Sequence, residues 1–229
     1  MFTGIVQALG IVMAESATVA GKRFTVSLAE LSNAPIAMGD SVCVSGVCLT
    51  VTRIANGNVS FDVISETLRH STLGQKGVAA RVNLELAVRP DSYLGGHFVQ
   101  GHVDAVGRVV GINAKAEDWR ITIEVTPEQI AYIAPKGSVT VEGVSMTVAG
   151  VTKRTFTIAV IPTTLERTTL SALKVGEQVN VETDILARTV VHYLQQMTRM
   201  GKGVGGGGGG GSGGGGELTL EKLVKAGLA

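Results

Sequence analysis

Short stretches of alternating apolar and polar residues run along most of the chain, and they predict β-strands. Segments such as VCV at 42–44 and TIEV at 122–125 are rich in β-branched residues. Turn-forming sequences separate these stretches, for example GD at 39–40, NGN at 56–58 and KG at 136–137. Regularly spaced short strands predict small all-β units, either closed barrels or sandwiches.

The pattern occurs twice, with a constant offset of 97 residues and no gap from residue 1 to residue 185. SVCVSGVCLTVT at 41–52 corresponds to SVTVEGVSMTVA at 138–149, and VISETLRHSTL at 63–73 corresponds to VIPTTLERTTL at 160–170. VNLE and VNVE repeat at the same offset. An internal repeat of this kind predicts two domains of like fold. We place them at 1–97 and 98–185, with RPDSYLGG at 89–96 as the linker.

After the second copy the apolar period becomes helical. Ile185, Val190 or Val191, Leu194 and Met197 fall on one stripe, which predicts an amphipathic helix at 186–202. An apolar stripe that follows both domains favours association with another subunit. Docking on the chain's own barrels is the alternative.

The end of the chain has a different composition. GVGGGGGGGSGGGG at 203–216 is typical of a flexible tract, either engineered or natural. ELTLEKLVKAGLA at 217–229 is a short amphipathic tail. Neither segment enters the functional argument.

Composition excludes several functions. The net charge is +1 and aromatic residues make up 4% of the chain, which argues against nucleic-acid binding by an OB-like barrel. No apolar run is long enough to span a membrane, so we expect a cytoplasmic protein.

The cysteines and histidines suggest neither a disulfide nor a metal site. Cys43 and Cys48 are five residues apart, an odd separation that would place them on opposite faces of one strand. His97 and His102 share that spacing. We therefore expect no disulfide and no metal, and Cys43 as a small buried apolar side chain.

Several paired motifs resemble those of the riboflavin synthase family. They are the start MFTGIV, the pair GVCLTV and GVSMTV, the junction GGHFVQGHVD, and the pair ETLRHSTL and TTLERTTL. The resemblance covers the chain up to the Gly-rich tract. It implies two six-stranded antiparallel Greek-key barrels and a C-terminal helix that holds a homotrimer together. It also implies a site between the N-terminal barrel of one subunit and the C-terminal barrel of the next.

The activity implied by this resemblance is a transfer reaction without a cofactor. One molecule of 6,7-dimethyl-8-ribityllumazine transfers a four-carbon unit to a second, which gives riboflavin and 5-amino-6-ribitylamino-uracil. Association with a lumazine synthase assembly would also fit the family. The main alternative is a lumazine- or flavin-binding protein of the same fold without turnover, and a purely structural trimer is a further one.

Two identical substrates with opposite fates require two related sites that differ chemically. The copies differ in this way at Cys48 and Ser145, and at Ile5 and His102. Drift between repeats is the alternative explanation. His102 is the first candidate for proton transfer from the 7-methyl group, because an imidazole titrates near neutral pH. A hydrogen-bonded structural histidine is its alternative.

The other roles follow from the resemblance and the residue types. Cys48 or a bound water would add to the second lumazine, and backbone groups at the two glycines would hold the pyrimidine edge. Lys136 would reach a neighbour's ligand or remain a solvated turn lysine, and His97 would support the site.

The expected site residues form one catalytic and two binding sets. Catalytic roles are expected for Phe2, Cys48, His102, Ser145, Thr147 and Asp184. Substrate binding in the first copy is expected from Gly4, Ile5, Val6, Cys48, Leu49, Thr50, Asp62, Val63, Ile64, Ser65, Glu66 and Thr67. In the second copy it is expected from Gly101, His102, Val103, Lys136, Ser145, Met146, Thr147, Ala159, Val160, Ile161, Pro162, Thr163 and Thr164.

Overall fold

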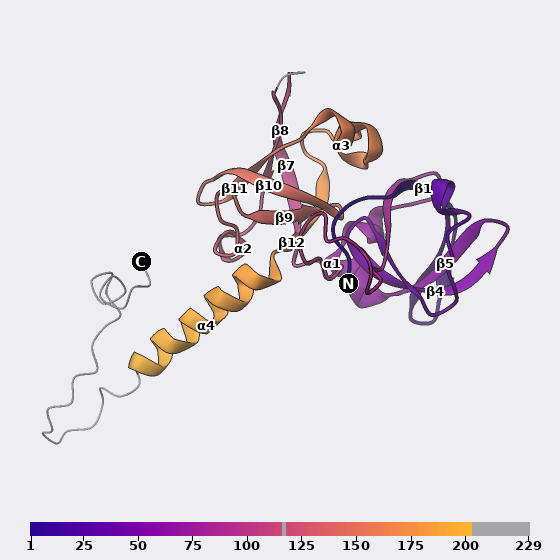
Figure 1. Cartoon of the computed structure of the whole chain (residues 1–229), viewed down its shortest axis with the longest axis horizontal. Helices are drawn as coiled ribbons and strands as arrows, with labels where there is room; N and C mark the ends of the chain where they lie inside the picture. The colour runs from indigo at the N-terminus through magenta and orange to yellow at the C-terminus, as the bar shows by residue number, and fades with distance from the viewer. Residues whose placement is uncertain (116–117, 203–229) are drawn as a thin grey trace, which may run out of the picture. The chain divides into compact units, whose positions relative to one another are not determined.

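A computed structural model describes residues 1–115 and 118–202 of the chain (Figure 1). Residues 1–187 form one compact unit that contains two barrels. The Gly-rich tract expected at 203–216 and the tail expected at 217–229 lie outside the described residues.

The N-terminal barrel is closed by six antiparallel strands in the order β1-β2-β5-β4-β3-β6. The jump from β2 to β5 and the return through β3 to β6 give the Greek-key connection that the resemblance predicted. The strands are β1 (Ala8–Thr18), β2 (Gly21–Ser27), β3 (Ser41–Val44), β4 (Val47–Ala55), β5 (Asn58–Ile64) and β6 (Arg81–Leu86). The short helical turns are η1 (Ala29–Leu31), α1 (Ser65–His70) and η2 (Thr72–Gln75).

The C-terminal barrel repeats this order as β7-β8-β11-β10-β9-β12, so the like fold expected from the repeat and the fold class implied by the resemblance are both confirmed. Its strands are β7 (Ala105–Lys115), β8 (Asp118–Glu124), β9 (Ser138–Val141), β10 (Val144–Val151), β11 (Thr155–Ala159) and β12 (Gln178–Thr183). The helical turns are α2 (Pro127–Ile130), α3 (Pro162–Arg167) and η3 (Thr169–Ala172). All six strand starts differ from their partners by the same 97 residues, from β1 and β7 to β6 and β12.

Alternating side chains fill each barrel. Phe61 and its counterpart Ile158 are fully buried, in two separate apolar clusters. β1 and β7 have a register shift at matching positions, Val12/Ala14 and Val109/Gly111. Because bulges increase local twist, matched bulges help both sheets to close in the same way.

The tips of two hairpins meet where the barrels join. Ser45-Gly46 connects β3 to β4, and Glu142-Gly143 connects β9 to β10; all four residues have positive φ, as a two-residue type I′ turn requires. A Cβ atom on Gly46 would lie 2.9 Å from the backbone nitrogen of Gly143. The glycines therefore allow the two backbones to approach closely.

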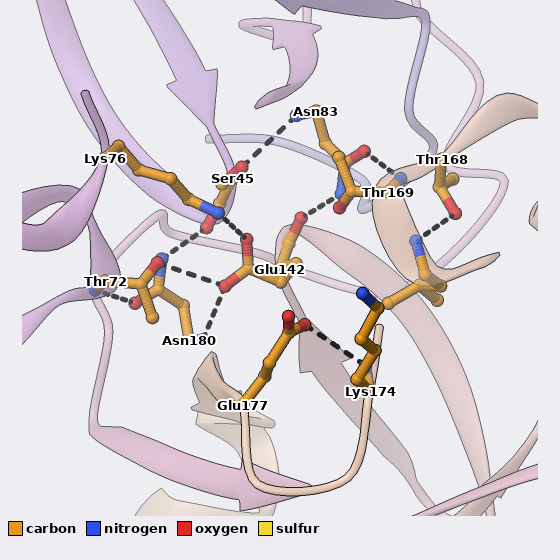
Figure 2. A network of polar contacts seen from close by, with 11 residues as sticks. Ser45, Thr72, Lys76, Asn83, Glu142, Thr168, Thr169, Lys174, Glu177 and Asn180 are labelled. Atoms are coloured by element: carbon orange, nitrogen blue, oxygen red, sulfur yellow. Dashed lines mark hydrogen bonds and ion pairs between the residues drawn. The ribbon is translucent and has the colours of Figure 1, made fainter. Parts of the chain in front are cut away.

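Two buried asparagines lock this junction by reciprocal hydrogen bonds (Figure 2). The Asn83 amide donates to the Glu142 carbonyl at 2.7 Å, and the Asn180 amide donates to the Ser45 carbonyl at 2.8 Å. The Asn180 side-chain oxygen also accepts from the Thr72 backbone N–H at 2.7 Å. Since each barrel satisfies buried polar groups of the other, the two halves are tied together by polar contacts as well as by packing.

The structure contradicts the expected placement of the cysteines. Cys43 on β3 lies directly opposite Cys48 on β4, so their side chains share one face. The odd-spacing argument assumed a single strand, but the turn at Ser45-Gly46 reverses the chain between the two residues. Cys43 is 2% exposed, as expected for a buried apolar side chain.

The C-terminal helix α4 (Ile185–Lys202) is also present. Its large apolar side chains Leu186, Val190, Leu194 and Met197 recur at intervals of three or four residues, and all four are about half exposed. The helix therefore has the apolar stripe that the sequence predicted.

Candidate active site

The leading segments of the two copies lie side by side and then cross. The backbone N–H of Phe2 donates to the Val99 carbonyl at 2.7 Å, and that of Val99 donates to the Phe2 carbonyl at 3.1 Å. Beyond this pair, each segment continues onto the barrel of the other copy. We call residues 2–5 and 99–102 the crossing segments.

One backbone hydrogen bond attaches each crossing segment to Cys48 or to its counterpart Ser145. The Cys48 N–H donates to the Gly101 carbonyl at 2.8 Å, and the Ser145 N–H donates to the Gly4 carbonyl at 2.7 Å. Both glycines have φ of +77°, and a Cβ on either would lie 2.6 Å from the Cβ of the residue it faces. Only glycine fits both the conformation and the space.

Two buried glutamates hold the crossing segments. The Glu182 carboxylate accepts backbone N–H bonds from Gln100 at 2.7 Å, Gly101 at 2.9 Å and His102 at 3.1 Å. Glu85 accepts from the backbone N–H groups of Thr3 at 2.6 Å and of Gly4 at 2.9 Å. A carboxylate with such donors fixes the backbone of the segment it binds.

Sequence reasoning missed both glutamates as site residues. The signal was present, because the pair VNLE and VNVE keeps a glutamate near the end of a buried strand in both copies. A charged residue retained inside a buried strand requires partners. The partners lie 81 residues away along the chain, at Gly4 for Glu85 and at Gly101 for Glu182, so only the fold identifies them.

The pKa of Glu182 is raised to about 7, mainly by burial and also by the Asp104 charge, against the lowering effect of the three backbone N–H groups. Replacement of Glu182 by glutamine is therefore expected to change the pH dependence of stability. Between pH 4.5 and about 7 the folded state binds more protons at Glu182 than the unfolded state does. The contribution of Glu182 protonation to the free energy of unfolding is therefore fully present below pH 4.5, and it is lost as the pH rises through about 7.

Urea unfolding of both proteins at several pH values measures this effect. The stability of Glu182→Gln relative to wild type should increase by roughly 3 kcal/mol across that window. Using the difference between the two proteins removes the contributions of Glu85, Glu142 and His97, which they share. A difference that stays constant with pH would mean that the three donors keep the carboxylate ionised in the folded state.

A pocket of about 290 Å³ lies where the second crossing segment meets the N-terminal barrel. It brings together six of the expected residues: Cys48, Glu66, Thr67, Gly101, His102 and Val103. Val47, His70 and Ser71 also line it and were not expected. We call this cavity the N-terminal pocket.

The crossing changes which residues share a site. Cys48 and His102 belong to different copies, yet both line the N-terminal pocket. Ser145 in the second barrel lies instead against Gly4, next to Ile5. The Cys48 thiol and the His102 imidazole therefore lie at the N-terminal barrel, and the Ser145 hydroxyl lies at the C-terminal barrel.

A second imidazole lies beside Ser145. The ring of His97 is 2.8 Å from the Ser145 hydroxyl through Nδ1 and 3.2 Å from the Thr140 hydroxyl through Nε2. Burial lowers the pKa of His97, although Asp184 raises it. A neutral ring between two hydroxyls donates one hydrogen bond and accepts the other, so it can relay a proton.

The remaining expected residues occupy three kinds of position. The side chains of Leu49, Val63, Met146 and Val160 are packed in the barrel cores, and that of Phe2 is buried with Cys43 and Val99. The exposed ones are Ile5, Thr50, Asp62, Ile64, Ser65, Lys136, Thr147, Ala159, Ile161, Pro162 and Thr163. Val6, Thr164 and Asp184 are half-buried.

The carboxylates of Asp62 and Asp184 already have defined partners. Asp62 pairs with Arg23 at 2.5 Å and 2.7 Å, and this contact lowers the pKa of Asp62. The Asp184 carboxylate accepts the backbone N–H of Leu186 at 2.9 Å, at the start of α4.

Metal and membrane features are absent where the structure can be described. No group of three histidine, cysteine, aspartate or glutamate side chains in residues 1–115 and 118–202 could hold a metal ion. Among those same residues, no helix is long and apolar enough to cross a membrane.

Two like barrels that exchange their leading segments beside a pocket define a duplicated small-molecule-binding protein. The lumazine binding domain family matches the chain twice, at residues 3–87 and 100–184. Riboflavin synthase of Mycobacterium bovis is 43% identical over 195 residues, which is 83% of this chain and 96% of that protein. Riboflavin synthase of Photobacterium phosphoreum is 38% identical, over 85% of this chain and 89% of that protein. This chain belongs to the riboflavin synthase family.

Solved structures agree with this assignment. LumP complexed with riboflavin superposes with a TM-score of 0.72 at 29% identity, over 80% of this chain and 99% of that one. LumP complexed with 6,7-dimethyl-8-(1'-D-ribityl) lumazine has the same TM-score at 26% identity.

Proposed function

We propose that this chain catalyses the riboflavin synthase reaction, in which one molecule of 6,7-dimethyl-8-ribityllumazine transfers a four-carbon unit to a second. The products are riboflavin and 5-amino-6-ribitylamino-uracil. The observation that carries this proposal is the chemical difference between two equivalent sites, with Cys48 and His102 beside the N-terminal barrel and Ser145 and Ile5 beside the C-terminal one. A dismutation needs such a difference because its two identical substrates have opposite fates.

We assign proton transfer at the 7-methyl group to His102, which lines the N-terminal pocket with Cys48. Cys48 or a bound water adds to the second lumazine. Ser145 and Thr147 pass protons or stabilise developing charge, with His97 as the hydrogen-bond partner of Ser145. Asp184 orients a catalytic group. Phe2 acts through the packing of the crossing segments.

Ligand binding would use backbone and polar groups of both barrels. Gly4 and Gly101 sit where each crossing segment meets a barrel, a position suited to the pyrimidine edge. The ribityl hydroxyls would bind polar residues at the start of α1 and α3. These are Ser65, Glu66 and Thr67 in the first copy and Thr163 and Thr164 in the second, with Asp62 nearby in the sequence.

We further propose that the chain forms a homotrimer through α4. The exposed apolar stripe on this helix supports association, because large apolar side chains are stabilised by burial. The complete site would then lie between the N-terminal barrel of one subunit and the C-terminal barrel of the next, where Lys136 would reach the neighbour's ligand. The domain boundaries would be 1–97, 98–185 and 186–202. A cytoplasmic location and association with a lumazine synthase assembly are further parts of this proposal.

The second candidate is a binding protein without turnover. The likeness to LumP, solved with the lumazine, with riboflavin and with flavin mononucleotide, favours ligand binding by this fold. Both barrels here retain polar residues at the reactive positions, and the riboflavin synthase relatives are more similar in sequence than LumP is.

An absorbance assay distinguishes these functions. Purified full-length chain is mixed with 6,7-dimethyl-8-ribityllumazine, and the formation of riboflavin is followed without added metal or cofactor. We expect steady formation of riboflavin, with one riboflavin for every two lumazines consumed. Saturable lumazine binding without riboflavin would instead establish the binding protein.

A further inference from the structure

The two cysteines face each other across the hairpin of β3 and β4. Cys43 and Cys48 are register partners, two positions beyond the tip at Ser45-Gly46. The Cys48 N–H donates outside this hairpin, to the Gly101 carbonyl at 2.8 Å. The pair is therefore of the non-hydrogen-bonded kind, in which opposite Cα atoms are about 4.5 Å apart and side chains are closest. Such a separation falls within the range of about 4.4–6.8 Å found for disulfides.

The surroundings of the pair differ on its two sides. Both cysteines pack into one small cluster with Phe2, Val99 and Ala87. Cys43 is 2% exposed, whereas Cys48 is half-buried and lines the N-terminal pocket. A small oxidant can therefore reach Cys48 through the pocket, whereas Cys43 is buried and does not line the pocket.

We propose that Cys43 and Cys48 form a reversible disulfide, and that this modification removes the Cys48 thiol from the N-terminal pocket. A peroxide is the class of oxidant that completes the chemistry. Hydrogen peroxide oxidises the Cys48 thiol to a sulfenic acid and releases one water. The Cys43 sulfur then attacks the Cys48 sulfur, the S–O bond breaks, and the second water leaves. Two thiols and one peroxide thus give one disulfide and two waters.

The order of these steps follows from exposure. Burial raises the pKa of the Cys43 thiol well above its usual value, and the Glu85 carboxylate raises it further. Cys43 is therefore a poor first target for peroxide, because the thiolate is the reactive form. It is suited to the second step, in which its partner is already held opposite on the next strand.

The second barrel has no equivalent chemistry. Thr140 and Ser145 are register partners at the matching positions of β9 and β10. Their hydroxyls cannot form a crosslink, and both contact His97. Oxidation would therefore change only one of the two sites, and a dismutation that needs both would stop. The effect on turnover rests on the proposed function, but formation of the disulfide does not.

Mass spectrometry tests the disulfide directly. Trypsin releases both cysteines in one peptide, Phe24–Arg53, which has no internal lysine or arginine. The full-length chain is treated with hydrogen peroxide, denatured in iodoacetamide and digested. We expect loss of both alkylation sites, and fragment ions that place a loss of two hydrogens on residues 43–48. Oxygen added to Met38, which is 71% exposed in the same peptide, is distinguished by the same fragment ions. Dithiothreitol should restore both alkylation sites, together with any turnover lost on oxidation.

Cys43→Ala is the matched control, because it keeps Cys48 and removes its partner. In this variant peroxide should add oxygen to Cys48, and recovery with dithiothreitol should decrease as sulfinic acid accumulates. The proposal is overturned if wild-type Cys48 gains oxygen as it does in the variant, or if both thiols remain alkylatable after peroxide treatment. Because this readout is a peptide mass, it decides the question even for a chain without turnover.

Discussion

Replacement of His102 by glutamine is expected to lower kcat by roughly 100- to 10,000-fold, the usual contribution of a general acid–base group. Glutamine keeps a hydrogen-bonding side chain in the pocket but cannot exchange a proton near neutral pH. Riboflavin binding should therefore remain, because the pocket walls and the Glu182 contact to the His102 backbone are unchanged. Turnover is measured by riboflavin absorbance, and binding by quenching of flavin fluorescence.

His70→Gln is the control for this experiment. His70 lines the same pocket, but its Nε2 contacts Glu66 at 3.1 Å and its side chain is 69% exposed. Loss of this imidazole should affect kcat much less. Cys48→Ser, assayed in the same way, tests the nucleophile. If His102→Gln and Cys48→Ser both retain full turnover, the assignment of the site is wrong.

Replacement of Gly101 by alanine is expected to displace the second crossing segment and to disrupt the N-terminal pocket. The new Cβ would lie 2.6 Å from the Cys48 Cβ and 2.7 Å from the Cys48 backbone nitrogen, in a backbone with φ of +77°. A left-handed conformation costs an alanine roughly 1–2 kcal/mol, and forced overpacking costs about 1–3 kcal/mol more. Thermal unfolding and riboflavin binding measure the two consequences.

Gly57→Ala separates the two contributions. Gly57 has φ of +72°, but a Cβ there would meet nothing within 4 Å. It should therefore show the backbone cost alone, with riboflavin binding unchanged. Equal destabilisation by the two substitutions would mean that the crossing segment moves away from Cys48 without cost.

The repeat was sufficient to predict two domains of like fold, and the family resemblance added the closed barrels. Matched strands such as VNLE and VNVE have the same apolar pattern, and equal patterns fold into equal units. The two closed barrels with the same strand order confirm this prediction. The Ser45-Gly46 turn shows the limit of pattern reasoning, because a two-residue reversal inside SVCVSGVCLTVT was treated as a continuous strand. That one turn places Cys43 opposite Cys48 and makes a disulfide feasible.

The candidate site was predicted only as a list of residues. Cys48, Gly101, His102 and Val103 were identified from paired motifs, and the structure gathers them in one pocket. The roles of these residues remain predictions. Glu85 and Glu182 recur in both copies, but they were overlooked because most of their partners are distant backbone N–H groups, which carry no signature in the sequence.

The sequence by itself therefore determined that two like β-domains follow one another, because side-chain periodicity is a local property that each copy expresses separately. Only the tertiary structure decided that the leading segments cross, and hence that Cys48 shares a pocket with His102 rather than with Ile5. The physical reason is that the crossing depends on contacts between residues far apart in the chain. Two buried carboxylates and two glycines hold these segments, and no local pattern specifies which barrel each segment will meet.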